Sequence, residues 1–167
     1  MNTKSPISIS SLRGRTIVAA AFQMLCPGCV AETIPQLNRV RLLFPQDRVA
    51  VLGLHSVFEH HAGMGEASLR AFLHEYKVHF PVGIDRHLPN DPIPVTMQTY
   101  RFRGTPTLLL IDADGGLRRQ HFGHVADLQL GAEIMTLMRD TTQPSSKTEG
   151  ASTMQMHCEV GASSCAT

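Results

Sequence analysis

The chain contains no tryptophan and only two tyrosines among its 167 residues. Charges of opposite sign almost balance, and the formal net charge of +1 leaves no basic excess that would point to nucleic acid or an anionic membrane surface as a partner. No apolar stretch approaches the roughly 20 residues that a membrane-spanning helix needs. These absences favour a globular protein that binds neither nucleic acid nor a membrane.

We also expect no separable signal peptide. Arg13 and Arg15 precede a short apolar run, but that run leads directly into a pair of cysteines, so we interpret it as a buried strand. A chain without a signal is expected in the reducing cytoplasm, where stable structural disulfides are rare. The four cysteines therefore suggest redox chemistry or metal binding before structural cross-links.

Apolar periodicity predicts strands that alternate with helices. The expected strands are 16–22, 48–54 and 80–84. The expected helices are 30–43, 67–76, 95–100 and 128–138, and Pro35 should interrupt the first of them. A strand–turn–strand unit spans 106–123. This order predicts an α/β domain over residues 1–140, with a central mixed β-sheet flanked by helices on both faces. The first two strands should be parallel and adjacent, and the hairpin antiparallel. The polar composition of 141–167 predicts a flexible C-terminal tail.

Cys26 and Cys29 form a CxxC motif directly after the first expected strand. Pro27 suits the first position of the following helix, where its missing N–H would have had no partner. The unpaired N–H groups of that helix start favour a thiolate at Cys26, and only a thiolate attacks a disulfide. Cys29, one turn along, is placed to attack the mixed disulfide and release the product. A zinc site and a pair of inert buried thiols remain alternatives, although a closed zinc site wants four ligands and the chain has no second CxxC.

Thr105 and Pro106 stand at the beginning of the strand that opens the hairpin. Proline is costly inside a sheet unless it serves a turn or a cis bond. A cis proline facing the CxxC motif could present the Thr105 backbone to an extended substrate segment. An ordinary trans proline at the edge of a strand has equal weight from the local sequence.

Taken together, these stretches resemble the thioredoxin superfamily, and more narrowly the redoxin group of TlpA- and ResA-like thiol-disulfide oxidoreductases and AhpC/TSA peroxiredoxins. The resemblance covers roughly residues 12–139 and rests on LRGRTIVAAAFQMLCPGC, CVAETIP, VAVLGL, FLHEYKVHFPVGID and YRFRGTPTLLLIDADGGL. It implies a thioredoxin fold, with Cys26 as the attacking cysteine, Cys29 as the resolving cysteine, and Pro106 as a cis proline preceded by Thr105. It also implies protein or small-molecule disulfides and a thiol reductant as partners, and we expect no cofactor and no bound metal.

Two positions depart from the family pattern. Leu25 stands where relatives usually carry tryptophan before the first cysteine, which changes a surface that faces the substrate. Ala19 and Gln23 replace the proline and threonine of the peroxiredoxin motif PxxxTxxC, and that threonine helps to bind peroxide. The favoured activity is therefore dithiol–disulfide exchange. A thiol peroxidase and a non-catalytic module that binds soft metals are the alternatives.

His55 and Glu59 follow the second expected strand and are candidates for proton transfer to and from Cys29. The alternative for His55 is a polar residue that merely ends the strand. His60 and His61 could contribute to a metal site, but their spacing matches no closed site.

The last ten residues contain the other two cysteines, Cys158 and Cys165. One interpretation is a pair of unremarkable thiols in a flexible tail. Another is an auxiliary pair that exchanges with the Cys26–Cys29 disulfide, since tethered thiols have a high effective concentration. A third is capture of a soft metal with the neighbouring Met and His side chains.

Overall fold

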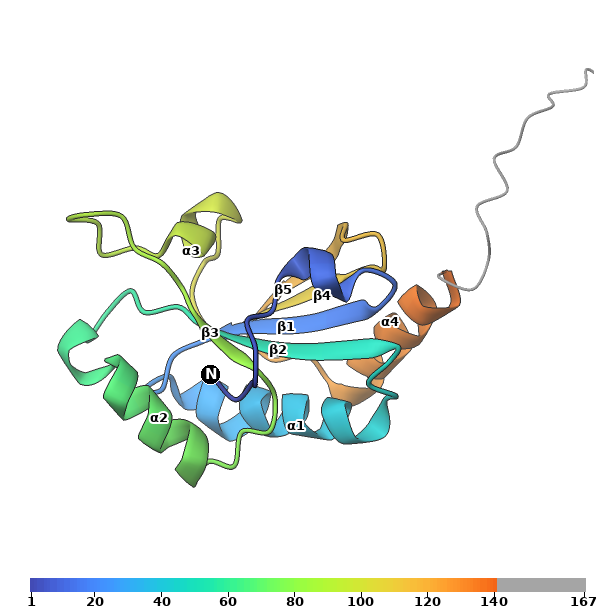
Figure 1. The fold of residues 1–167 in the computed structure, drawn as a ribbon, viewed down its shortest axis with the longest axis horizontal. Helices are drawn as coiled ribbons and strands as arrows, with labels where there is room; N and C mark the ends of the chain where they lie inside the picture. The colour runs from blue at the N-terminus through green and yellow to red at the C-terminus, as the bar shows by residue number, and fades with distance from the viewer. Residues whose placement is uncertain (141–167) are drawn as a thin grey trace, which may run out of the picture.

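The structure is a computed structural model that describes residues 1–140 (Figure 1). The tail predicted at 141–167, with Cys158 and Cys165, lies outside the described residues. Within residues 1–140 no helix is long and apolar enough to cross a membrane.

Five strands form one mixed sheet in the order β3-β2-β1-β4-β5. The strands are β1 Thr16–Phe22, β2 Val49–His55, β3 Val82–Ile84, β4 Thr107–Ile111 and β5 Leu117–Phe122. As predicted, β1 and β2 are parallel neighbours and the β4–β5 hairpin is antiparallel; β4 also pairs antiparallel with β1, which places the hairpin beside the central strand. The backbone of Met1 exchanges hydrogen bonds with Val82 on β3, and β5 forms the opposite edge of the sheet.

The continuous apolar sequence of β1 reflects burial on both faces of the sheet. Val18 and Phe22 point into the main core. The residues directly before them, Ile17 and Ala21, pack into clusters on the other face. A strand buried in this way holds its carboxyl end in a fixed place, and the CxxC motif follows at that end.

Helices flank both faces of the sheet, which confirms the predicted architecture. On the main-core face lie α1 Ile34–Leu43, α2 Glu66–Glu75 and α4 Asp127–Asp140. The other face is covered by α3 Val95–Thr99 and by a short 3-10 helix, Ile9–Leu12. Figure 1 shows α1 and α2 on one side of the sheet and α3 on the other.

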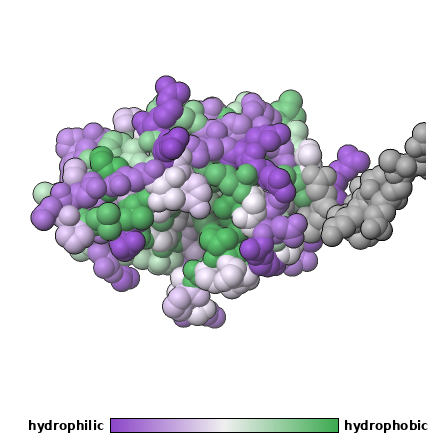
Figure 2. All heavy atoms as spheres, turned by 90° about the horizontal axis from the view of Figure 1, so that it is seen from above, coloured by the Kyte–Doolittle hydropathy of each residue, from purple (hydrophilic) through white to green (hydrophobic). Residues whose placement is uncertain are grey.

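The face with α3 and Ile9–Leu12 is only partly covered. An apolar groove of about 760 Å³ runs between these two elements, and Leu52, Leu54 and Leu109 form part of its floor. Figure 2 looks onto this face and shows hydrophobic side chains gathered among hydrophilic ones. The helical cover is therefore thicker on the face that carries α1, α2 and α4.

The interruption predicted at Pro35 takes the form of a π-helical turn. The helix begins at Pro27, passes through the π turn Cys29–Thr33 and continues as α1. Pro35 stands in the first turn of α1 and has no N–H to donate, while the Ile34 N–H bonds the Cys29 carbonyl five residues back. The turn that carries Cys29 is thus wider than an ordinary α-helical turn.

Gly53 on β2 is required by the close packing around it. A Cβ atom at this position would lie 3.0 Å from Phe80 and 3.1 Å from both Phe22 and Val82, all of them buried. We therefore expect Gly53→Ala to lower the free energy of unfolding by about 1–3 kcal/mol. Gly131→Ala in α4 is the control, because a Cβ atom added there would have no neighbouring residue within 4 Å. This substitution should raise the free energy of unfolding by up to about 1 kcal/mol. Urea denaturation measures both, and equal effects would contradict the packing argument.

Candidate functional site

The two cysteines of the motif lie at the start of the helix that follows β1. Cys26 is the last residue before the helix begins at Pro27, and Cys29 lies in the π turn. Both are free thiols, and their sulfur atoms are 2.6 Å apart. The Cys29 N–H donates a hydrogen bond to the Cys26 sulfur at 3.3 Å, so the start of the helix directs a donor at that atom. The sequence prediction that the motif begins a helix is confirmed.

The environments of the two thiols differ. Cys26 is half-buried, whereas Cys29 is fully buried among core residues. Burial, reinforced by the hydrogen bond to Cys26, raises the pKa of Cys29 to about 12. Cys29 is therefore a neutral thiol at pH 7, and its sulfur is closed off from solvent.

The loop before β4 approaches the same two sulfur atoms. The Thr105–Pro106 peptide bond is cis, which decides between the two alternatives that the sequence leaves open. The Thr105 carbonyl oxygen accepts a hydrogen bond from the Cys26 sulfur at 3.4 Å. The Pro106 ring lies over Gly28, where an added Cβ would be 3.6 Å from the ring. Thr105 and Pro106 thus form one wall of the site around Cys26.

A buried glutamine ties this wall to the loop after β2. Gln23 is 1% exposed, and its amide nitrogen lies 3.4 Å from the Thr105 hydroxyl and 3.4 Å from a Glu59 carboxylate oxygen. Its amide oxygen accepts a hydrogen bond from the Phe58 N–H at 3.3 Å. One side chain therefore holds two loops that flank the cysteine pair.

Comparison with known proteins gives the family. A crystal structure described as a thioredoxin-like superfamily protein shares 56% sequence identity over 83% of this chain and 89% of its own, with a TM-score of 0.80. The chain belongs to the thioredoxin-like superfamily. A thiol-disulfide isomerase from Corynebacterium glutamicum shares 41% identity over 80% of this chain and 87% of its own, with a TM-score of 0.79. No family model and no curated protein matches the sequence.

Solved structures of lower sequence identity show the shared fold alone. A putative thiol:disulfide interchange protein DsbE from Chlorobium tepidum is 20% identical over 79% of this chain and 86% of its own, with a TM-score of 0.65. The CxxC turn, the cis proline loop and the mixed sheet described above are therefore set in an architecture that tolerates extensive sequence change.

The network around Gln23 was not foreseen from the sequence, where this residue only marked the missing threonine of the peroxiredoxin motif. Gln23→Leu would leave the Phe58 N–H and the Thr105 hydroxyl without this partner in a partly buried place. We expect the free energy of unfolding of the thioredoxin-like domain to fall by about 1–3 kcal/mol. The exposed Gln46 is the control, since Gln46→Leu should change it by less than about 0.5 kcal/mol. Denaturant titration checks both, and a Gln23→Leu variant as stable as the control would show that the network contributes nothing.

The two residues proposed for proton transfer lie in different surroundings. Glu59 is exposed and contacts the site through Gln23. His55 is 1% exposed at the end of β2, its ring lies 5.5 Å from the Phe22 ring, and its Nε2 has no hydrogen-bond partner. Burial lowers the pKa of His55 to about 4, so its ring is neutral at pH 7. The structure thus brings Glu59, but not His55, into the hydrogen-bond network of the cysteine site.

Leu25, predicted to face the substrate, is 60% exposed beside Cys26. Its side chain lies near Gly63, where an added Cβ would be 3.9 Å from it. An apolar side chain thus projects to solvent next to the half-buried sulfur, on a surface where the family usually has a tryptophan.

Three histidines surround a hollow at the end of β2. His55, His61 and His87 line a hollow of about 320 Å³, but the Nε2 atoms of His61 and His87 are hydrogen-bonded to the Pro92 and Val57 carbonyl groups. Within residues 1–140 no group of three or more His, Cys, Asp or Glu side chains is arranged to hold a metal ion. The alternative of metal capture by Cys158 and Cys165 lies outside the described residues.

Proposed function

We propose that this chain is a thiol-disulfide oxidoreductase in which Cys26 is the nucleophile and Cys29 the resolving thiol. The observation that carries the proposal is the pairing, at 2.6 Å, of a half-buried sulfur with a fully buried one at the start of a helix. The 41% identity to a protein described as a thiol-disulfide isomerase supports the same class of reaction.

The reaction follows from the different environments of the two sulfurs. The Cys26 thiolate attacks one sulfur of a substrate disulfide, forms a mixed disulfide and releases the first substrate thiolate. Cys29 then loses its proton and attacks the Cys26 sulfur, which breaks the mixed disulfide and releases the second thiolate. Two electrons pass to the substrate, two protons restore its thiols, and the protein is left with a Cys26–Cys29 disulfide. A dithiol reductant reverses these steps on the protein.

The burial of Cys29 ensures that Cys26 reacts with the substrate first. Its high pKa and complete burial prevent it from attacking external disulfides. Once Cys26 is bonded to the substrate, the Cys29 sulfur already lies beside the bond that it must attack. We propose Glu59 as the group that takes its proton, because the carboxylate is exposed to solvent and linked to the Thr105 side chain through Gln23.

The substrate groove in this proposal is formed by Thr105, Pro106 and Leu25. The Thr105 carbonyl next to Cys26 is an acceptor for a backbone N–H of an extended substrate segment. Leu25, next to Cys26 in the chain, supplies an exposed apolar side chain. Both small disulfides and disulfides in peptides fit this description.

The proposal is tested by catalysed reduction of a disulfide. The reduced protein, at catalytic concentration, should accelerate the reduction of hydroxyethyl disulfide by dithiothreitol. Chromatography of the product thiol measures the rate. When the dithiol is removed, the intact mass should reveal the protein with a disulfide between Cys26 and Cys29. A rate equal to that of dithiothreitol alone would overturn the proposed function.

The peroxidase alternative has no specific support among the described residues. Gln23 occupies the position of the peroxide-binding threonine, and its amide is already bonded to Phe58, Glu59 and Thr105. We expect Cys26 to react with hydrogen peroxide no faster than a free thiol at the same pH. Competition with a small-molecule thiol measures this rate, and an acceleration of a thousandfold would restore the peroxidase assignment.

A further inference from the structure

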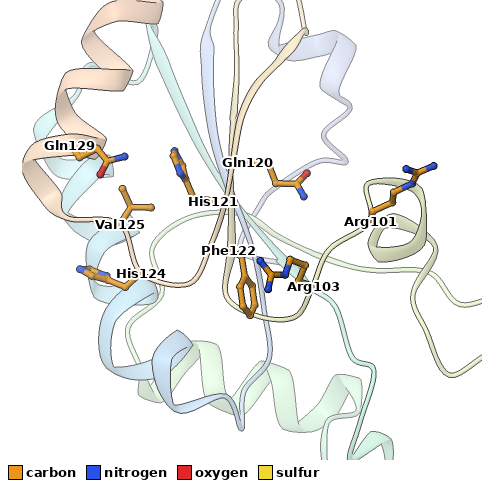
Figure 3. A pocket seen from close by; sticks show the side chains of 8 residues that line it. All are labelled: Arg101, Arg103, Gln120, His121, Phe122, His124, Val125 and Gln129. Carbon is orange, nitrogen blue, oxygen red and sulfur yellow. The ribbon is translucent and has the colours of Figure 1, made fainter.

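A polar pocket of about 400 Å³ lies along the edge strand β5, next to the proline loop (Figure 3). Its lining includes Arg101 and Arg103 from the segment before the cis proline, His121 and Phe122 from β5, and His124 and Gln129 from the segment that follows. We call it the β5 pocket. Two arginines and two histidines in one small hollow contrast with a chain whose net charge is only +1.

Short backbone connections join the β5 pocket to the cysteine site. Arg103 precedes Thr105 by two residues, and the Thr105 carbonyl oxygen is 3.4 Å from the Cys26 sulfur. On the other wall, the Gly123 N–H donates a hydrogen bond to the Pro106 carbonyl at 2.8 Å, and His124 comes next in the chain. The loop that contacts the Cys26 sulfur therefore lies directly beside residues that line the pocket, Arg103 in the chain and His124 after the bonded Gly123.

The guanidinium group of Arg103 lies over the ring of Phe122. Its guanidinium carbon lies 5.3 Å from the centre of that ring. Gly104 lets the ring approach the loop, since a Cβ there would be 3.1 Å from Phe122 and the residue adopts a φ of +153°. The cation thus lies over an aromatic ring that also lines the pocket.

The positive charge of the two arginines is not neutralised by the protein. Within residues 1–140 neither Arg101 nor Arg103 forms an ion pair, and both are exposed. Glu133, which contacts two residues of the lining, already accepts hydrogen bonds from His121 at 2.8 Å and from Gln129 at 3.0 Å. The guanidinium groups therefore remain available for an external carboxylate, which they bind with paired N–H donors.

We propose that the β5 pocket binds a carboxylate of the substrate, so that the protein prefers disulfides that carry anionic groups near the sulfur–sulfur bond. This proposal rests on the proposed function, since it names the substrate class of the same cysteine site. The carboxylate stays intact throughout the exchange. It positions one half of the disulfide against Cys26, and it leaves with the thiol that is released.

The test compares three alkyl disulfides that differ in charge: dithiodipropionate, with two carboxylates, the neutral hydroxyethyl disulfide, and the dication cystamine. Each is mixed with the reduced protein, and the rate of loss of the Cys26 thiol is read from quenched samples by peptide mass. Each rate is divided by the rate of the same disulfide with dithiothreitol, which is uncharged. We expect the corrected rate to be about tenfold higher for dithiodipropionate than for the neutral disulfide at low salt, and lowest for cystamine. Added salt should reduce this preference.

Variants assign the preference to the pocket. The Arg101→Gln/Arg103→Gln double variant should lower the ratio of the anionic to the neutral rate about tenfold. Arg70→Gln on α2 is the matched control, because it removes a positive charge from an exposed arginine paired with Glu66 and should leave the ratio unchanged. If the double variant does not fold by circular dichroism, the salt dependence of the unmodified protein decides.

The outcomes separate the two proposals. Reaction with all three disulfides at equal corrected rates, or an equal loss of preference in Arg70→Gln, would overturn the carboxylate site and leave the oxidoreductase in place. Absence of reaction with any of them would overturn the proposed function and the carboxylate site with it.

Discussion

A Cys26→Ser variant is expected to lose at least about a thousandfold of its disulfide reductase activity. A serine hydroxyl is not ionised near neutral pH and forms no exchangeable bond with sulfur. Cys29 cannot replace the nucleophile, because it is fully buried and its pKa is raised to about 12. The rate of hydroxyethyl disulfide reduction by dithiothreitol measures the loss, and turnover within tenfold of the unmodified protein would contradict the role of Cys26.

Cys29→Ser is the matched variant and should behave differently. Its Cys26 thiol should still attack, so that one equivalent of substrate thiol is released and a mixed disulfide accumulates. Intact mass reveals this adduct, which the Cys26→Ser variant cannot form at the motif. The measurement belongs in a background with Cys158→Ser and Cys165→Ser, since either cysteine is a thiol that could resolve the adduct. A faster release in the chain that keeps these two cysteines would support their proposed role as auxiliary thiols.

The second large effect concerns the pH dependence of stability. His55 is buried and its pKa falls from 6.5 to about 4, so between these values the unfolded chain binds a proton that the folded chain does not. Folding stability contributed by the neutral ring is therefore present above pH 6.5 and is lost as the pH falls toward 4. The loss should amount to about 3 kcal/mol in the free energy of unfolding.

His55→Phe tests this effect because it keeps an aromatic ring opposite Phe22 and removes the titrating nitrogen. We expect the free energy of unfolding of this variant to decline about 3 kcal/mol less than that of the unmodified protein between pH 7 and pH 4. His79→Phe, at an exposed histidine, should leave the pH dependence unchanged. Urea titrations at several pH values give the slopes. Parallel curves for His55→Phe and the unmodified protein would show that folding does not lower the pKa of His55.

Local patterns in the sequence were sufficient for most of the fold. The run Thr16–Phe22 was predicted with its observed bounds, because a strand buried on both faces has no polar positions to blur its ends. The strand expected at 48–54 is observed as Val49–His55. This shift by one residue includes His55, a polar side chain that pattern alone assigns to a loop. Burial of that histidine depends on Phe22 and on the hollow beyond it, which are tertiary contacts.

In the candidate site too, local sequence identified some residues, whereas others depend on tertiary contacts. Spacing and context identified Cys26 and Cys29, since the chemistry of a helix start is local. Gln23 was not identified as a site residue, because its partners Phe58, Glu59 and Thr105 lie 35, 36 and 82 residues away. The β5 pocket was missed for a related reason: Arg103 and His124 meet only because β5 pairs with β4. Arginines close to the proline motif were the one local signal for it.

The two edges of the sheet have a consequence for self-association. Edge strands offer unpaired N–H and C=O groups on which another chain could add a strand. On β5, Arg118, Arg119 and Gln120 are consecutive exposed polar residues, and a second copy pairing there would bring arginines close to one another. At the other edge, β3 is three residues long and Val82 is already bonded to Met1. Extension of the sheet by a further copy is therefore unfavourable at both ends, so pairing between copies should not compete with the partners that we propose for Cys26.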